Sequence, residues 1–314
     1  MKTIYSIVLM LFLALTLTAQ TKTVRVVYLV PSNKTIHEEY KTALTNATLN
    51  VQRFYNDQLG GKTFTFNGVE TYTTQPSSYF TQNNNSNSDF FWKIGAQGLL
   101  AANGTANGQT AWMFYIDADT PCGQLTGGVP SYAAMGANAL RGLSQQPTLT
   151  CDTNAPDGIP ANLDLYTGYS AHELGHSFGL YHPAGCEAPI NVCSNPEAPY
   201  SIMWLGYQCY PNTYFLNNDV AFLQNSGFFT EQHYNVSGNV TAPNGVGLRN
   251  VTVQLKNINT LVVTTTITSS FGNYSFSNVP FGNYEISINS RTYKFTPVFK
   301  SIQLNTTLNF QGLE

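Results

Sequence analysis

The sequence predicts an α+β domain built on a mixed, twisted sheet, followed by a small all-β sandwich domain. Strand-like and helix-like stretches alternate in the first half of the chain, which is the order of a sheet with helices packed on it. Beyond Asn235, short alternating strands broken by Gly, Asn and Pro follow one another, as in a sandwich. A length of 314 residues accommodates both. We therefore expect a leader at 1–19, a larger domain at 20–234 and the sandwich at 235–314.

Hydrophobic patterning predicts the elements of the first half. β-branched runs and period-two alternation indicate strands, and apolar residues at near-helical spacing indicate helices. Gly60 and Gly61 form a stop signal after the first helix. The predicted elements are strands at 23–30, 62–74 and 110–119, helices at 36–61 and 90–103, and a polar loop at 82–89.

The middle of the chain is predicted to hold two more helices between loops. Gly, Pro and Ala are frequent from 120 to 160, where an edge strand is expected near 129–140. A Cys- and Pro-rich loop lies between the two helices. The helices are expected at 164–180 and at 216–229, the second with Asn217 or Asn218 as its N-cap.

The stretch HELGHSFGLYH, from His172 to His182, holds three of the chain's five histidines. His172 and His176 lie one helical turn apart, so both imidazoles project from one face. Two nitrogens placed in this way can hold one zinc ion at about 2.0–2.1 Å. Glu173 lies next to the first histidine and can reach a water molecule at the metal without being a ligand. These residues predict a metal site that activates water.

His182 is expected to be the third ligand. It follows His176 by six residues, a spacing that would place the two side chains on different faces of a continuous helix. The helix must therefore end before His182. Gly179 allows the chain to turn back because glycine adopts left-handed backbone angles, and Pro183 prevents renewed helix. Three histidines leave a fourth coordination position open, as in catalytic zinc sites. A surface helix with scattered histidines is the alternative.

The same motif resembles the extended zinc motif of the metzincin metallopeptidases, and YSIMWLGY resembles that family's methionine-containing turn, with Met203 as a packing residue. The resemblance spans most of 22–230 and implies a metzincin-like catalytic domain with an active-site helix and a closing helix. It implies a secreted endopeptidase with one catalytic zinc, in which Glu173 is the general base. A protein or peptide substrate would extend along the edge strand near 129–140.

The resemblance fits no one metzincin subfamily. Pro183 stands where matrix metallopeptidases usually have Ser and astacins have Glu. Leu205 stands where astacins and serralysins carry a tyrosine that faces the metal. Tyr207 or Tyr210 is a candidate to replace that tyrosine, and a position in the core or at the rim is the alternative for both.

The N-terminus has the features of a secretory signal peptide. Lys2 precedes an apolar run at 4–17, and small residues up to Ala19 follow it. The run is too short to span a bilayer comfortably, and no later segment has the pattern of a membrane span. We therefore expect cleavage after Ala19 and a secreted, extracellular mature chain, with an uncleaved anchor as the alternative.

Cysteine usage agrees with export. In an oxidising compartment, five cysteines predict two disulfides and one free thiol. The preferred pairing joins Cys122 to Cys151 and leaves one bridge among Cys186, Cys193 and Cys209. A cysteine-based zinc site is the alternative, although the spacings lack the usual CxxC pairs.

Charge and acidic clusters add little to these expectations. A formal net charge of −3 indicates neither a nucleic-acid surface nor a polybasic membrane surface. The segment Asp152–Asp164 groups oxygen ligands, so Ca²⁺ is a second candidate metal, which Asp117 and Asp119 could join. A turn-rich loop is the alternative for this segment.

The C-terminal segment GNYSFSNVPFGNYEISI resembles the pattern of carboxypeptidase-regulatory-like, transthyretin-type sandwiches over about 236–310. This resemblance implies no catalytic residue there, but a stabilising domain or one that contacts a surface or matrix. Two functions remain as alternatives to the endopeptidase. One is a non-enzymatic extracellular binding or adhesion protein that retains a metal site, and the other is a zinc hydrolase of a non-peptide amide or ester.

Overall fold

A computed structural model describes residues 22–81, 87–119, 127–149, 162–187 and 192–313. The expected leader, Cys122, Cys151 and most of the candidate calcium segment lie outside the described residues. No described helix is long and apolar enough to cross a membrane.

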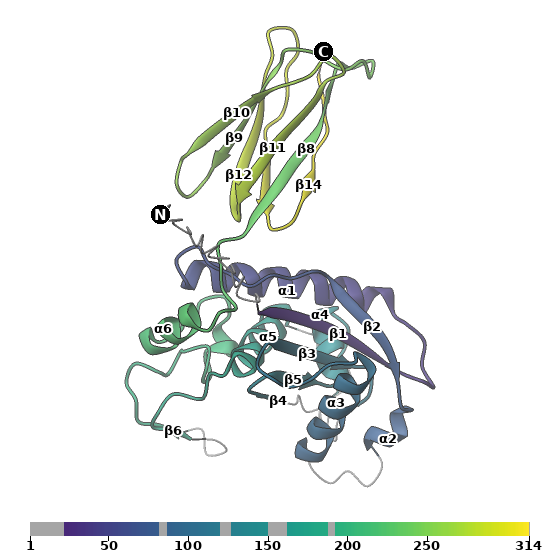
Figure 1. The fold of residues 1–314 in the computed structure, drawn as a ribbon, viewed down its shortest axis with the longest axis vertical. Coiled ribbons are helices and arrows are strands. Elements are labelled where there is room, and N and C mark those ends of the chain that lie inside the picture. The colour runs from purple at the N-terminus through teal and green to yellow at the C-terminus, as the bar shows by residue number, and fades with distance from the viewer. Residues whose placement is uncertain (1–21, 82–86, 120–126, 150–161, 188–191, 314) are drawn as a thin grey trace, which may run out of the picture.

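A five-stranded sheet forms the centre of the larger part of the molecule (Figure 1), in the order β2-β1-β3-β5-β4. Its strands run parallel except β4, which pairs antiparallel with β5 at one edge. The strands are β1 (Thr23–Pro31), β2 (Val69–Thr74), β3 (Thr110–Ile116), β4 (Gly127–Val129) and β5 (Tyr132–Met135). The mixed sheet predicted from the alternating element order is confirmed.

Helices cover both faces of this sheet, and the alternation of β1 shows why. Val26 and Tyr28 point into one hydrophobic core with α1, α4, α5 and α6, whereas Val27 and Leu29 point into a second core with α2 and α3. Strands buried on both faces are typical of parallel sheets. The helices are α1 (Glu38–Gln58), α2 (Ser77–Thr81), α3 (Asn87–Ala101), α4 (Ala137–Leu143), α5 (Leu163–Phe178) and α6 (Asn217–Asn225).

Two predicted strands are shorter than their patterns suggest. Residues 62–68 lie outside β2, and Phe64 is buried in the core behind α1, where its carbonyl oxygen accepts a hydrogen bond from Gln52 Nε2 at 2.7 Å. Alternation here therefore arises from packing against a helix rather than from sheet pairing. Of the edge strand expected at 129–140, only Val129 belongs to the observed edge strand β4, whereas β5 lies inside the sheet and the residues from Ala137 form α4.

The predicted N-cap of the closing helix is wrong. Asn217 is the first residue of α6, and Leu216 occupies the cap position without a side-chain cap of its own. The carboxylate of Asp219, in the first turn, instead accepts a hydrogen bond from the Leu216 backbone. An acidic side chain of the first turn therefore does the capping that we expected of asparagine.

A two-sheet sandwich follows the larger part (Figure 1). One sheet has the order β10-β9-β12-β13, and the other has the order β11-β8-β14, with β15 also paired to β8. Apolar side chains of both sheets meet in a separate core that includes Val236, Leu255 and Ile286. The strands are β8 (His233–Thr241), β9 (Thr252–Asn257), β10 (Val263–Ile267), β11 (Asn273–Pro280), β12 (Gly282–Asn289), β13 (Val298–Ile302), β14 (Thr306–Thr307) and β15 (Phe310–Gln311).

Polar contacts join the sandwich to α1. Gln303 Nε2 donates to the Leu49 carbonyl oxygen at 2.8 Å, and Arg53 Nη2 donates to Gln303 Oε1 at 3.3 Å. The two parts keep separate apolar cores, so this contact is an addition to each fold rather than part of either core.

A chain that ends at Thr230 is therefore expected to fold without the sandwich. Thr230 still pairs with Thr63 at this end, so the last contact of the larger part is retained. Circular dichroism and thermal unfolding of the shortened chain should show one cooperative transition. An insoluble or non-cooperative product would mean that the sandwich is integral to the fold.

Candidate metal centre

The helix α5 carries the histidine motif and has well-defined ends. The Asn162 side chain caps it by accepting hydrogen bonds from the backbone N–H groups of Asp164 and Leu165. Gly179 ends it in the left-handed conformation with φ 107°, and the Leu180 N–H then bonds to the Gly175 carbonyl oxygen at 3.0 Å. The helix and its glycine stop are both as predicted.

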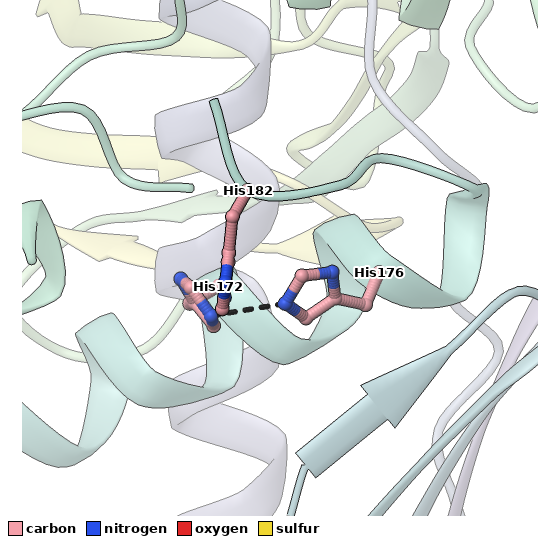
Figure 2. Close-up of side chains that lie close together, drawn as sticks. All are labelled: His172, His176 and His182. Atoms are coloured by element: carbon pink, nitrogen blue, oxygen red, sulfur yellow. Dashed lines mark hydrogen bonds between the residues drawn. The ribbon is translucent and has the colours of Figure 1, made fainter. Parts of the chain in front are cut away.

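The turn at Gly179 brings the three histidines together (Figure 2). Their nearest ligand nitrogens all lie within 4.8 Å of one another. Tetrahedral coordination at about 2.0–2.1 Å separates ligand nitrogens by roughly 3.3 Å, so small side-chain rotations would complete the set. His172, His176 and His182 could therefore hold a metal ion.

Backbone carbonyls orient two of the imidazoles. His172 Nδ1 donates to the Ile202 carbonyl oxygen at 2.6 Å, and His176 Nδ1 donates to the Leu180 carbonyl oxygen at 2.8 Å. A protonated Nδ1 leaves Nε2 with a free lone pair in the neutral ring. Metal-ligating histidines are usually held by bonds of this kind.

The two Nε2 atoms of His172 and His176 lie 3.1 Å apart, the contact drawn as a dashed line in Figure 2. With both protons on Nδ1, neither Nε2 has a hydrogen to donate, so two lone pairs face each other at this distance. A cation between them would turn this repulsion into attraction. The donor set thus fits a metal ion better than it fits a hydrogen bond.

Burial keeps the imidazoles in the neutral form that binds metals. It lowers the pKa of His172 to about 3, with a smaller contribution from the neighbouring His176, and it lowers the pKa of His176 to about 4. Burial also lowers the pKa of His182, which lies at the exposed mouth of the site. All three rings therefore offer neutral nitrogens near pH 7.

Glu173 is buried beside the histidines. Its Oε2 atom is shielded from solvent and has no hydrogen-bond partner, and burial raises the pKa of its carboxyl to about 8. An unpartnered buried carboxylate oxygen is costly, so its retention calls for an explanation at the site. A water molecule in the cleft would supply the missing partner.

The turn after the motif forms the floor of the site. Met203 is fully buried, and a Cβ atom on Gly175 would lie 2.4 Å from its sulfur, so helix and turn are in direct contact. Trp204, next in the chain, packs its ring edge-to-face on His182 with centroids 5.3 Å apart. Met203 is therefore a packing residue against α5 beside the histidines, and Trp204 is a neighbour that the sequence did not reveal.

The two candidate tyrosines have different environments. The Tyr207 ring lies 5.4 Å from the His172 ring and stacks on Tyr169 at 4.3 Å, at the wall of the site. Tyr210 is buried against Phe54 and donates to the Asn50 carbonyl oxygen at 3.2 Å. Tyr210 is therefore a core residue, and Tyr207 is the tyrosine that faces the histidines.

A cleft of about 300 Å³ lies over the three histidines and Glu173. The edge strand β4 forms one wall, and Tyr169, Trp204, Leu205 and Tyr207 form the other. Among the described strands, β4 pairs only with β5, so its other edge is free to bond an extended chain.

Adding a methyl group at Gly128 tests how closely β4 lies against α5. A Cβ atom there would lie 2.7 Å from the Glu173 carbonyl oxygen and from His176 Cβ, whereas one at Gly127 would lie 3.8 Å from Glu173 Oε2. Gly128→Ala is therefore expected to lower the free energy of unfolding by about 1–3 kcal/mol. Gly127→Ala, the matched control, should be close to neutral. Urea unfolding that gave equal stabilities would place β4 farther from the helix.

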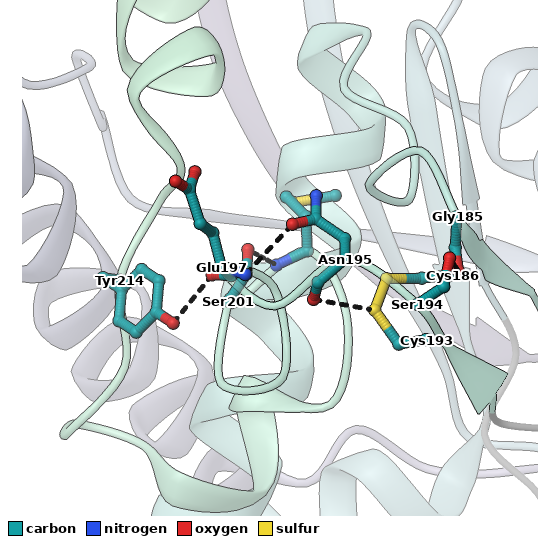
Figure 3. Close-up of a disulfide and its surroundings, with 9 residues drawn as sticks. Gly185, Cys186, Cys193, Ser194, Asn195, Glu197, Ser201 and Tyr214 are labelled. Atoms are coloured by element: carbon teal, nitrogen blue, oxygen red, sulfur yellow. Dashed lines mark hydrogen bonds between the residues drawn. A yellow bond between two sulfur atoms is a disulfide. The ribbon is translucent and has the colours of Figure 1, made fainter.

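A disulfide ties the loop that leads from the third histidine to the floor of the site (Figure 3). Cys186 and Cys193 are joined by a disulfide in the small hairpin of β6 (Cys186–Glu187) and β7 (Val192–Cys193). Farther along the loop, the Tyr214 hydroxyl donates a hydrogen bond to the Glu197 carbonyl oxygen at 2.9 Å. One bridge among the last three cysteines is thus confirmed, with Cys209 free and exposed, and this bridge is consistent with an oxidising compartment.

The acidic residues proposed to join a calcium site have other partners. Asp117 bonds Lys34 Nζ at 2.7 Å, and Asp119 bonds Arg141 Nη1 at 2.6 Å. Within the described ranges, the three histidines are the one group of at least three His, Cys, Asp or Glu side chains that could hold an ion.

The carboxypeptidase regulatory-like domain family matches residues 235–311, which is the sandwich. No curated protein matches the chain. Among solved structures, wild-type OgpA from Akkermansia muciniphila has a TM-score of 0.46 with 13% identity over 90% of this chain and 92% of that chain. Catalytically inactive OgpA from the same organism, in complex with an O-glycopeptide substrate, has a TM-score of 0.44 with the same identity and coverage.

The pilin subunit BcpA of Bacillus cereus has a TM-score of 0.22 with 16% identity over 26% of this chain and 31% of that chain. All three TM-scores are too low to carry a function across, so the function has to be argued from the chemistry of the site. The family match covers the sandwich, so it gives no information about the residues of the metal centre.

Proposed function

We propose that this chain is a zinc-dependent endopeptidase that acts outside the cell on protein or peptide substrates. The observation that carries the proposal is the convergence of three neutral imidazoles beside a buried, unpartnered carboxylate. Three neutral nitrogens and an open fourth position are the donor set of catalytic zinc. The disulfide between Cys186 and Cys193 supports an oxidising, extracellular location.

The residues of the cleft divide the chemistry among them. His172, His176 and His182 would hold the metal, which when bound polarises a substrate carbonyl and makes a water molecule more acidic. Glu173 accepts the proton of the attacking water on Oε2 and returns it to the leaving amine. Burial raises the pKa of this carboxyl, and a bound cation nearby would lower it again, so that the group can accept a proton near neutral pH.

The free edge of β4 is the place for the substrate backbone. An extended peptide there would add a strand to the sheet and lie across the Glu173 side of α5, since β4 contacts both Glu173 and His176. This position revises the expected edge from 129–140 to Gly127–Val129. The proposal predicts cleavage inside a chain rather than at its ends, because the free edge binds backbone and not a terminus.

Incubation of the protein with a mixed peptide library, followed by mass spectrometry of the products, tests this function. We expect internal cleavage that stops with a chelator and returns with added zinc, and about one zinc per chain in elemental analysis. A chain that binds no zinc after reconstitution at neutral pH would refute the mechanism. A chain that binds zinc but hydrolyses only esters or non-peptide amides would refute the substrate class.

A further inference from the structure

The third histidine of the metal centre is held differently from the other two. His172 and His176 lie on α5, and each donates Nδ1 to a backbone carbonyl oxygen. His182 lies on the segment that follows the helix (Figure 2) and is exposed. Within the described ranges its ring forms no hydrogen bond, and the rings packed against it are those of His172, His176 and Trp204.

The backbone before His182 is fixed, but this does not fix the ring. The Leu180 N–H bonds to the Gly175 carbonyl oxygen at 3.0 Å, and the Leu180 carbonyl oxygen accepts from His176 Nδ1 at 2.8 Å. These bonds place the start of the His182 backbone, whereas the side chain still has staggered alternatives about its own bonds. A ring that turned out to solvent would leave the site with two nitrogens, so a contact that selects the inward orientation has a direct effect on the metal.

Trp204 provides the contact that selects this orientation. Its indole packs edge-to-face on the His182 ring, with centroids 5.3 Å apart and an angle of 78° between the planes, a geometry in which aromatic rings attract. Trp204 is buried and follows Met203, whose sulfur lies against Gly175 of α5. The indole is therefore fixed relative to the helix that carries the other two histidines.

The same indole belongs to a small apolar cluster that contains the disulfide. The buried members of the cluster are Cys186, Ala198 and Trp204, and the partly buried members are Cys193, Leu205 and Leu216. The cluster is separate from the large core behind α5 and buries little apolar area. Its order therefore depends in large part on the covalent bridge between Cys186 and Cys193 (Figure 3), which restricts the loop.

We propose that Trp204 is the positioning residue of the third ligand, and that the bridge between Cys186 and Cys193 keeps Trp204 in place. Trp204 does for His182 what the backbone carbonyl oxygens do for the other two imidazoles. The proposal rests on the proposed function in one respect, namely that the three histidines hold zinc. It makes the zinc affinity of the site depend on a tryptophan and a disulfide that are not ligands.

Zinc titration against a competing chelator, without any peptide, tests the role of the indole. Trp204→Leu should lower the zinc affinity by about 10–100-fold, as the loss of an outer partner of a metal ligand does. Trp204→Phe keeps an aromatic ring against His182 and should retain most of the affinity. Trp92→Leu is the matched control, because it removes an indole that is 54% exposed on α3, and it should bind zinc as the natural chain does. Thermal unfolding of the metal-free chains shows whether each variant is folded.

A double-mutant cycle distinguishes positioning from a general effect on the fold. If Trp204 acts through His182, Trp204→Leu should lower the zinc affinity no further in a His182→Ala chain. An equal loss in both backgrounds would overturn the proposal, because the indole would then act on the whole site. Equal affinities of the natural and Trp204→Leu chains would overturn it as well. A natural chain that binds no zinc would overturn the proposed function together with this inference.

Removal of the bridge tests the second half of the proposal. The double change Cys186→Ala and Cys193→Ala should lower the zinc affinity of the natural chain, because it loosens the cluster that holds Trp204. The same double change should have no further effect in the Trp204→Leu chain. An unchanged affinity of the natural chain without its bridge would overturn the role assigned to the disulfide.

Discussion

Glu173→Gln is expected to lower the rate of peptide cleavage by about 10²–10⁴-fold while leaving the zinc content unchanged. Glutamine keeps the size of the side chain and removes the group that accepts a proton. The three histidines that could hold the metal are unaltered, and Nδ1 of two of them remains bonded to backbone carbonyls. Metal binding and proton transfer should therefore separate, and both can be measured on one preparation by elemental analysis and a peptide assay.

The matched control is Glu197→Gln, which changes an exposed carboxylate on the neighbouring loop. It should keep both the zinc and the rate. If Glu173→Gln cleaved peptides as fast as the natural chain, another base would be at work. If it lost its zinc, Glu173 would be a ligand, and the fourth coordination position would not be free for water.

The local part of the site could be predicted from the sequence because it depends on short-range geometry. The spacing of His172 and His176 follows from one helical turn, and the return of His182 follows from the left-handed turn at Gly179. Both are properties of a few consecutive residues. A pattern of five fixed positions was therefore enough to locate the group of histidines.

The supporting contacts could not be predicted, because they join segments that are distant in sequence. The Ile202 carbonyl oxygen that orients His172 becomes a partner only when the turn around Met203 docks under α5. The contact of Gly128 with the Glu173 side of that helix requires the edge strand to cross it. The periodicity of apolar residues does not predict such contacts, because they depend on how closely two backbone segments approach each other and not on residue type.

The strand predicted at 62–74 is wrong over residues 62–68 for a related reason. Alternating apolar residues mark any segment with one buried face, whether that face meets a sheet or a helix. Phe64 and Phe66 alternate because both pack into the core behind α1, yet the residues around them join no ladder beyond the single bridge of Thr63. Pattern alone could not distinguish the two environments.

His176→Ala is expected to remove both metal and activity. The imidazole of His176 groups with those of His172 and His182 and bonds the carbonyl oxygen of Leu180. Its loss therefore leaves only the nitrogens of His172 and His182 to hold the ion. Loss of an outer partner of a ligand typically costs about 10–100-fold in metal affinity, and loss of the ligand itself should cost more. Zinc titration with a competing chelator measures this directly, independently of the peptide assay.

His37→Ala and His233→Ala are the matched controls, because they remove the chain's two other histidines, which lie outside the metal centre. Both should bind zinc and cleave peptides as the natural chain does. A His176→Ala chain that is folded, retains tight zinc and still cleaves peptides would show that the ion is held elsewhere. A His176→Ala chain that retains zinc but is inactive would instead make His176 a catalytic group rather than a ligand. Loss of zinc and activity together, in a chain that unfolds cooperatively, is the one result that supports coordination by His176.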